Sequence, residues 1–293
     1  MNLKAIVLSI IVLAVIAYFG VAAYIASVLT VQAPSPIKYD RDKIGRGTDV
    51  VFKSTDNAQL AGWYFPGTND KAIMFVHGAG SQNRANEVYG APDIAKYFLE
   101  QGYTILMFDL RGTGQSQEAR ISFGQNESKD VAGAFNYLVK QEYKPESIGI
   151  ISDSLGAIAT VLAADTIKTS GGIVLDSPAT EVKPIVSNIM TDEHSIPGFL
   201  HPAIYLWAKI LYQVDVDSVR PVDHISVLKN TPLLFLHGEA DTLIPPSNSA
   251  TLLSMVSSGN RVTFPNTKHV ETFKTLPDLY LKTVSEFFTK NLK

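Results

Sequence analysis

The chain has 293 residues and a formal net charge of −3, with acidic and basic residues interspersed along it. This balance excludes the strongly basic surface of most nucleic-acid-binding proteins, so we expect no nucleic-acid partner. The chain has no cysteine, which excludes disulfides, cysteine-ligated metals and a thiol nucleophile but leaves the redox compartment open.

The chain begins with a long apolar segment. Residues 5–31 carry no charged side chain and consist mainly of Leu, Ile, Val and Ala. A membrane-spanning helix needs roughly 20 consecutive apolar residues, whereas the apolar region of a cleaved signal peptide is usually about 7–15 residues long. No clear cleavage pattern ends the run before Pro34. We therefore predict one transmembrane anchor over residues 1–33. A cleaved signal peptide is the competing interpretation, and a buried core helix is a weaker one because every face is apolar.

The anchor predicts a single-pass protein of the cell membrane, but the side on which the rest of the chain lies stays open. Lys4 flanks the apolar segment on one side, and Lys38, Arg41, Lys43 and Arg46 flank it on the other. Positive charge alone would keep the following domain in the cytoplasm, but long domains can cross the membrane regardless of such charges.

Residues 34–47 are expected to form a linker, and residues 48–293 are enough for one large domain. Apolar runs that resemble strands alternate there with amphipathic helical patterns, which predicts an α/β fold with a mostly parallel sheet and helices on both faces. The predicted strands are 50–53, 60–65, 72–76, 104–108, 148–151, 172–175, 233–236 and 261–264, and the predicted helices are 93–101, 128–143, 155–164, 249–256 and 279–290.

The alternation is interrupted at about residues 177–230. This segment contains five prolines, several aromatic residues and no clean strand pattern. Two helical patterns, near residues 182–190 and 203–212, predict a mostly helical insertion between two strands of the sheet.

The clearest functional signal is the segment IISDSLG at residues 150–156, in which a strand leads into a helix through a tight turn that holds a serine. The nucleophile elbow G-x-S-x-G has this form, because small residues must flank the serine where strand and helix approach closely. Ser152 replaces the first glycine and is small enough for that position. If Ser152 were the nucleophile, Ile150 and Ser154 would occupy the glycine positions, so Ser154 is the favoured nucleophile. The competing interpretation is that Ser154 only caps the helix.

A nucleophilic serine needs a base, and the base needs a carboxylate that orients it. In this type of fold the chain order is Ser, then Asp or Glu, then His. Asp241 follows the predicted strand 233–236, and His269 follows the strand 261–264. Either residue alone could be an ordinary loop residue. Both lie at the carboxyl ends of strands, at the same sheet edge as Ser154, so we predict a triad of Ser154, Asp241 and His269.

A serine that attacks a carbonyl group also needs preorganised donors for the oxyanion, usually backbone N–H groups. One is expected from Leu155, directly after the nucleophile. The other is expected from the loop His77-Gly78-Ala79-Gly80, whose glycines allow a sharp turn, and Ala79 is the candidate. We expect His77 to hold the shape of this loop rather than to act as a base.

These motifs together resemble the α/β-hydrolase superfamily, particularly its membrane-anchored bacterial and ABHD-like serine hydrolases. The HG loop, a D-x-R-G-x-G-x-S turn from Asp109, the serine elbow, an HG-x-x-D-x-x-I-P segment from His237 and a late histidine occur in the family's order. The match runs from about Thr48 to the C-terminus and is weakest across residues 177–230, which correspond to the family's cap. We expect Asp109 and Arg111 to brace loops around the site.

The resemblance implies hydrolysis of carboxylic esters or thioesters without a cofactor. We expect Ser154 to form an acyl-enzyme, and the membrane anchor favours lipid-like substrates because it holds the site near them. A serine peptidase of the same fold is one alternative, although it usually needs a further gating domain. An idle membrane-bound binding protein is another, and the presence of all three triad residues disfavours it.

Two further expectations concern metals and the cap. A metal-dependent hydrolase is disfavoured because the six histidines show no close H-x-x-x-H pairing. The aromatic residues of the cap either line an apolar acyl channel or only pack its helices, and packing is the simpler interpretation for any one of them. They are Phe199, Tyr205, Trp207 and Tyr212.

Overall fold

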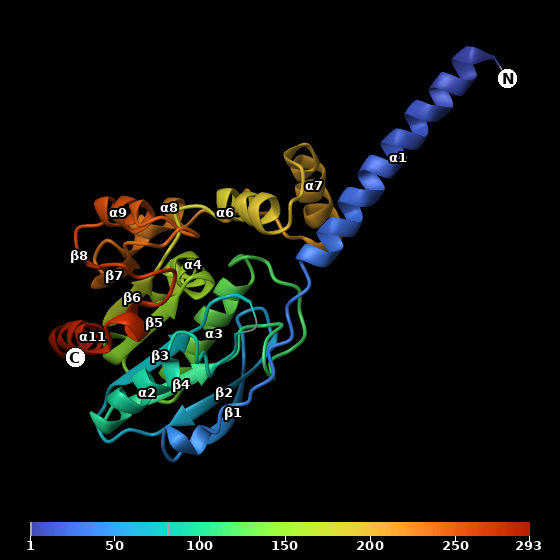
Figure 1. The fold of residues 1–293 in the computed structure, drawn as a ribbon. Helices are drawn as coiled ribbons and strands as arrows, with labels where there is room; N and C mark the ends of the chain where they lie inside the picture. The colour runs from blue at the N-terminus through green and yellow to red at the C-terminus, as the bar shows by residue number, and fades with distance from the viewer. Residues whose placement is uncertain (1, 81) are drawn as a thin grey trace.

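The computed structural model describes residues 2–80 and 82–293. Its centre is an eight-stranded sheet in the order β1-β2-β4-β3-β5-β6-β7-β8 (Figure 1). Strand β2 pairs antiparallel with β1 and with β4, and the other neighbouring pairs are parallel. The predicted mostly parallel α/β sheet is therefore confirmed. The strands are β1 (Thr48–Lys53), β2 (Gln59–Phe65), β3 (Ala72–Val76), β4 (Thr104–Phe108), β5 (Ile148–Asp153), β6 (Gly172–Asp176), β7 (Leu233–Gly238) and β8 (Gly259–Phe264).

Helices cover both faces of the sheet and extend beyond it at one end (Figure 1). The α-helices are α1 (Leu3–Leu29), α2 (Ala91–Glu100), α3 (Glu127–Lys140), α4 (Leu155–Leu162), α5 (Ala164–Ile167), α6 (Lys183–Asn188), α7 (His201–Tyr212), α8 (Pro221–His224), α9 (Ser247–Ser254), α10 (Thr272–Thr275) and α11 (Pro277–Asn291). Short 3₁₀ turns lie at Arg41–Lys43, Pro145–Ser147, Gly198–Leu200 and Ile225–Leu228, and a π-helical turn at Ile189–Glu193 follows α6.

The buried strand β3 explains why its sequence is an unbroken apolar run. Met74 packs into the cluster on the sheet face that α3 and α4 cover, whereas Ile73 and Phe75 pack into the cluster on the face that α2 and α11 cover. Successive side chains of a strand point to opposite faces. A strand that is covered on both faces therefore needs apolar residues at every position.

The segment between β6 and β7 forms α6, α7 and α8, and Figure 1 shows α7 lying beside the long helix α1. A third apolar cluster joins the two elements, because Ala22 and Ala26 of α1 are buried together with Ile204 and Ala208 of α7. The second half of the N-terminal helix α1 is thus packed against the insertion.

The expected linker is held against the domain by hydrogen bonds to two loops. The Gly114 N–H donates to Ser35 Oγ at 2.9 Å. The Asn83 side-chain amide donates to the carbonyl oxygens of Ser35 and Pro36 at 3.2 and 3.3 Å. The chain that leaves α1 therefore passes beside the loops that follow β3 and β4, at the edge of the sheet that carries the site.

Gly156 lies where α4 approaches the end of β3, and we expect Gly156→Ala to destabilise the protein. An added Cβ would lie 2.2 Å from the Val76 carbonyl oxygen and 2.7 Å from that of His77, and both are backbone atoms. Overpacking of this kind should lower the free energy of unfolding by about 1–3 kcal/mol, measurable by urea denaturation in detergent. Gly198→Ala is the control, because its Cβ would meet no heavy atom within 4 Å. Equal losses in the two variants would contradict this explanation.

Candidate active site

Ser154 lies in the turn between β5 and α4 with φ 50° and ψ −117°. A serine at positive φ is strained, and such strain persists only where the surrounding structure imposes it. Its N–H donates to the Asp176 carbonyl oxygen at 2.9 Å. On the other side lies Gly78, where an added Cβ would be 3.2 Å from the Ser154 Cβ. The strained turn thus places the serine side chain directly beside the HG loop.

His269 joins Ser154 to Asp241. Its Nε2 lies 2.9 Å from Ser154 Oγ, and its Nδ1 lies 2.7 Å from Asp241 Oδ2. An ionised carboxylate can only accept, so Nδ1 carries the proton and donates it to Asp241. The Nε2 is then free to accept the hydrogen bond of the serine hydroxyl. The structure thus brings together the three predicted triad residues in the arrangement that activates a serine.

Asp241 is buried and receives four hydrogen-bond contacts. Its Oδ1 accepts the backbone N–H groups of Leu243 and Ile244 at 3.1 and 2.9 Å, while Oδ2 faces His269 and His237. Burial alone would raise the pKa of Asp241, but the hydrogen bonds from His237 and His269 outweigh burial and hold this pKa well below its usual range. Asp241 is therefore ionised at neutral pH and can stabilise a positive charge on His269.

His237 is a neighbour of the triad to which sequence reasoning assigned no role. It is fully buried at the end of β7, its Nε2 donates to the Ile244 carbonyl oxygen at 2.8 Å, and the same nitrogen lies 3.3 Å from Asp241 Oδ2. His237 therefore fixes the loop that carries Asp241. Its position directly after the predicted strand 233–236, four residues before the acid, was the available signal.

The two candidate oxyanion donors lie on either side of the serine. Leu155 is the first residue of α4, where backbone N–H groups have no partner within the helix. Ala79 follows Gly78, the glycine that faces Ser154. Among the described residues, neither N–H has a hydrogen-bond acceptor. The His77 ring supports the loop, because Nδ1 donates to the Gly78 carbonyl oxygen at 2.7 Å and Nε2 accepts from the Leu110 N–H at 3.1 Å.

Ser152, the departure from the glycine motif, takes no part in the site. It is completely buried, and its hydroxyl donates to the Val174 carbonyl oxygen of the neighbouring strand at 3.0 Å. Serine is therefore accommodated at this position, as the small size of its side chain predicts.

Charged side chains brace the loops around the site. Asp109 binds Arg84 at 2.6 Å, and both side chains are fully buried. Arg111 binds Asp130 at 2.7 Å and Asp56 at 2.6 Å. The bracing expected of Asp109 and Arg111 is thus present, although the sequence did not reveal that Arg84 is the partner of Asp109.

A pair of buried carboxylates, Asp153 and Asp176, lies directly beneath the nucleophile turn at the ends of β5 and β6. Burial, followed by the nearby charge of Asp176, raises the pKa of Asp153 well above its ordinary range. Burial also raises the pKa of Asp176 to about 6, although hydrogen bonds from Thr272 and Ser177 oppose this. Burial thus favours the protonated form of both carboxyls, relative to that of an ordinary aspartic acid.

Asp176 should make stability depend on pH. Its pKa is about 6 in the folded protein, against an ordinary value of 3.8, so the folded state binds this proton more tightly. The contribution of Asp176 to the free energy of unfolding is then largest in acid and is lost as pH rises from about 4 to about 6. As pH rises from 4.5 to 7, we expect the free energy of unfolding of wild type to fall by on the order of 2 kcal/mol relative to that of Asp176→Asn. Urea titrations at each pH measure this difference. Parallel pH profiles for the two proteins would contradict this expectation.

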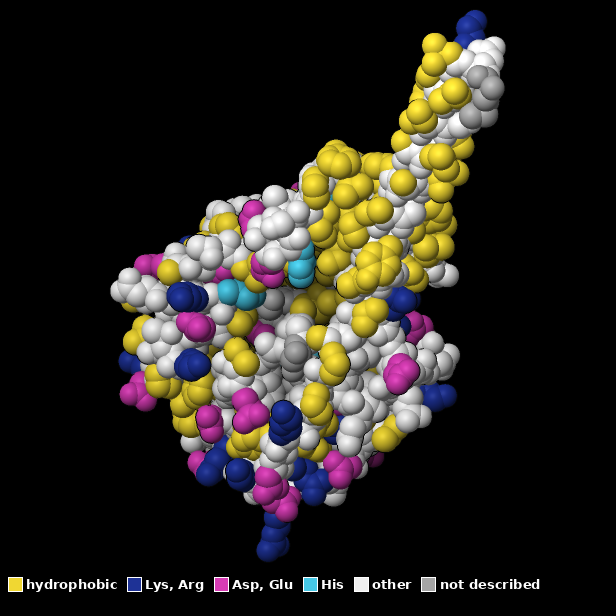
Figure 2. All heavy atoms as spheres, turned by 45° about the vertical axis from the view of Figure 1, so that its right-hand side comes forward, with side chains coloured by type: hydrophobic (Ala, Val, Ile, Leu, Met, Phe, Trp, Pro, Cys, Tyr) yellow, Lys and Arg dark blue, Asp and Glu magenta, His cyan; other side chains and the backbone are white. Residues whose placement is uncertain are grey.

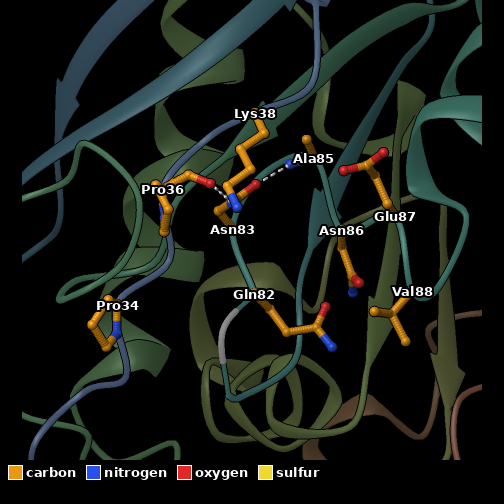
Figure 3. Close-up of a pocket in the computed structure, with 9 residues that line it drawn as sticks. All are labelled: Pro34, Pro36, Lys38, Gln82, Asn83, Ala85, Asn86, Glu87 and Val88. Carbon is orange, nitrogen blue, oxygen red and sulfur yellow. Dashed lines mark hydrogen bonds between the residues drawn. The ribbon is translucent and has the colours of Figure 1, made fainter.

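A hollow of about 540 Å³ lies between the linker and residues 82–88 (Figure 3). Pro34, Pro36 and Lys38 line one side, and Asn83 spans it to bond the Pro36 carbonyl oxygen. Asn86 also lines it and donates to Asp153, the residue before the nucleophile. The hollow thus adjoins the site through Asn86, but Ser154 and His269 do not line it.

The aromatic residues of the cap make packing contacts in the structure. Their partners are residues of α1, the insertion itself and the loop after β4. Phe199 stacks on Tyr18, Trp207 meets Phe19 edge to face, Tyr205 hydrogen-bonds Ser187, and Tyr212 lies under Arg120. In the part of the chain that the structure describes, no group of three or more His, Asp or Glu side chains is arranged to hold a metal ion.

Comparisons with known proteins agree with this fold. A family model described as serine aminopeptidase, S33, matches residues 67–230. The chain is 24% identical to the uncharacterized protein YfhR of Escherichia coli (strain K12) over 83% of this chain and 81% of that protein. Among solved structures, the esterase Pf2001 of Pyrococcus furiosus superposes with a TM-score of 0.73 at 21% identity, covering 90% of this chain and 99% of that one. The acylaminoacyl peptidase of Pyrococcus horikoshii superposes with a TM-score of 0.61 at 20% identity, covering 85% of this chain but 42% of that one.

Proposed function

The chain belongs to the serine aminopeptidase S33 family of α/β-hydrolases, and from this premise we propose that it cleaves carboxylic esters or thioesters through an acyl-enzyme on Ser154. Membership of this family makes the protein a hydrolase. The observation that carries the finer proposal is the position of His269, which lies within hydrogen-bond distance of both Ser154 and Asp241.

The proposed reaction has two halves. Ser154 Oγ attacks the substrate carbonyl carbon while His269 Nε2 takes its proton, and Asp241 stabilises the resulting imidazolium. The N–H groups of Leu155 and Ala79 donate to the oxyanion. The ester C–O bond, or thioester C–S bond, then breaks, and His269 returns the proton to the departing alcohol or thiol. A water molecule hydrolyses the acyl-enzyme by the same route.

An ester is a better candidate substrate than a peptide. The family and the structural neighbour from Pyrococcus horikoshii are both named as peptidases, so a peptidase is the main alternative. However, this chain spans less than half of the acylaminoacyl peptidase. In contrast, it covers 99% of the Pf2001 esterase.

We also propose that α1 is a membrane anchor and that the substrates are lipid-like. Within the described residues, α1 is the one helix long and apolar enough to cross a membrane, a test that a signal sequence near the N-terminus also passes. The contacts of its second half favour a helix that is retained. Ala22 and Ala26 are buried against α7, and Arg120 donates to the Ser27 carbonyl oxygen at 2.7 Å. Cleavage would remove both contacts.

The proposal is tested with the full chain in detergent micelles, using p-nitrophenyl esters of increasing acyl length beside amino-acid p-nitroanilides. We expect hydrolysis of the esters with an optimum in chain length. Hydrolysis of the anilides alone would indicate the peptidase. A folded protein inert on both series would indicate a binding protein that has lost its activity.

A further inference from the structure

The first half of α1 is too short to cross a membrane by itself. Every described residue from 2 to 17 is exposed, and contacts with the rest of the protein begin at Tyr18. At 1.5 Å per residue, residues 3–17 extend about 22 Å, whereas the hydrocarbon core of a bilayer is about 30 Å thick. If α1 spans the bilayer, the remaining 8 Å or so must come from the part of α1 that packs against α7.

Helix α7 runs alongside residues 18–27 of α1 in the same direction. Phe199, just before α7, stacks on Tyr18, and Trp207 in its middle meets Phe19. At the other end, Arg120 binds the Ser27 carbonyl oxygen and covers the Tyr212 ring at 3.9 Å. The beginning of α7 therefore lies beside the part of α1, from Tyr18 onward, that must be inside the bilayer if α1 spans it.

The outer face of this helix pair is apolar and exposed. Leu206 is 46% exposed, Ile210 is 59% exposed, and the two are one helical turn apart on α7. Phe199 is 68% exposed at the start of the same face. Figure 2 shows this apolar patch continuing without a break into the surface of α1. Apolar patches of this kind on soluble proteins mark sites of interaction.

Two cationic side chains beside this helix pair, Lys209 and Arg120, lie where the headgroups would be. Lys209, the charged residue of α7, reaches Asp215 beyond the end of the helix at 2.6 Å. Arg120 lies at the level of Ser27, near the end of α1. Long cationic side chains can reach headgroups in this way while their apolar stems remain in hydrocarbon, and Tyr and Trp favour the same interfacial depth.

From this continuity with α1 we propose that the outer face of α7 is a second membrane contact, seated in the lipid bilayer beside the anchor. Phe199 and Leu206 then lie in hydrocarbon, and Ile210 lies at the interface. The cap is thereby part of the membrane attachment, which holds the active site at a fixed distance from the lipid. The inference rests on the proposed anchor but not on the proposed chemistry.

The absence of cysteine in the chain allows a direct test. Single cysteines replace Leu206 and Ile210, with Leu13 on free α1 as the lipid control and the exposed Val51 of β1 as the aqueous control. Each full-length variant is labelled with the fluorophore NBD and placed in phosphatidylcholine nanodiscs. Doxyl-labelled lipid should quench the Leu206 probe as strongly as the Leu13 probe and the Ile210 probe less, and should leave the Val51 probe unquenched. Iodide in the water should quench in the reverse order.

Several results would overturn the inference. In one such result, iodide quenches the Leu206 and Ile210 probes as strongly as the Val51 probe, while the Leu13 probe is still quenched by lipid. This would show that α1 is in the membrane but that α7 lies in water. A Leu13 probe in water would remove the anchor as well. Protection from iodide without quenching by lipid would show that a second copy of the chain covers the face. Hydrolysis of a soluble short ester by the same samples reports the active site separately and shows that each variant is folded.

Discussion

Replacement of Ser154 by alanine is expected to lower kcat/KM for p-nitrophenyl esters by about three or more orders of magnitude. The substitution removes the only atom that can form the proposed acyl-enzyme, while the candidate oxyanion donors stay in place. Residual hydrolysis should therefore be slow but measurable. The rates are compared in detergent at equal concentrations of folded protein, which circular dichroism verifies.

Ser152→Ala is the matched control for this experiment. It removes a serine hydroxyl two residues away that is buried and bonded to the Val174 carbonyl oxygen. We expect Ser152→Ala to retain most of the wild-type rate. The reverse pattern, with loss of activity in the Ser152 variant and retained activity in the Ser154 variant, would show that Ser152 is the nucleophile and that Ser154 is not.

Asp241→Asn should have the second large effect, a loss in kcat of about 10⁴-fold. The amide has no charge with which to stabilise the His269 imidazolium. Its NH₂ group can also donate to Nδ1, which favours the tautomer with the proton on Nε2. That tautomer cannot accept the proton of Ser154. The loss is measured with saturating ester, so that a change in substrate binding does not contribute.

Glu239→Gln provides the comparison, because it makes the same chemical change two residues away. Glu239 is exposed and accepts a hydrogen bond from Thr263 at 2.8 Å, away from the triad. Its variant should keep the wild-type rate. Near-normal activity of Asp241→Asn would instead point to Asp176 as the acid, since the charge of His269 also acts on that buried carboxyl.

Much of the fold could be predicted because its elements have simple periodicities. The apolar run of β3 is continuous since both faces of the strand are covered, and the predicted segment 72–76 coincides with the strand. The ends of helices were less predictable. The last helix was expected over residues 279–290 but spans Pro277–Asn291, because Pro277 is suited to the first position of a helix.

The positions of the triad residues were predictable from a local rule. Ser154, Asp241 and His269 each follow a strand, and the carboxyl ends of parallel strands share one edge of the sheet. The structure places them within hydrogen-bond distance of one another. This agreement concerns position, and their roles in catalysis remain a proposal.

Interactions between distant segments could not be predicted in the same way. The Arg84–Asp109 pair and the pairing of Asp153 with Asp176 depend on how separate loops and strands align, and no periodicity encodes that alignment. The contact between α1 and α7 was hidden for another reason. A helix that is apolar on every face carries no pattern to show which face meets the protein.

The most direct test of the central claim is covalent labelling by a fluorophosphonate, which reacts with activated serines. The full-length protein is treated, digested and analysed by mass spectrometry. We predict one modified peptide with the label on Ser154, and no labelling in the Ser154→Ala, His269→Ala or heat-unfolded protein. Label on a different residue, or an unlabelled Ser154 in protein that still hydrolyses esters, would contradict Ser154 as the nucleophile.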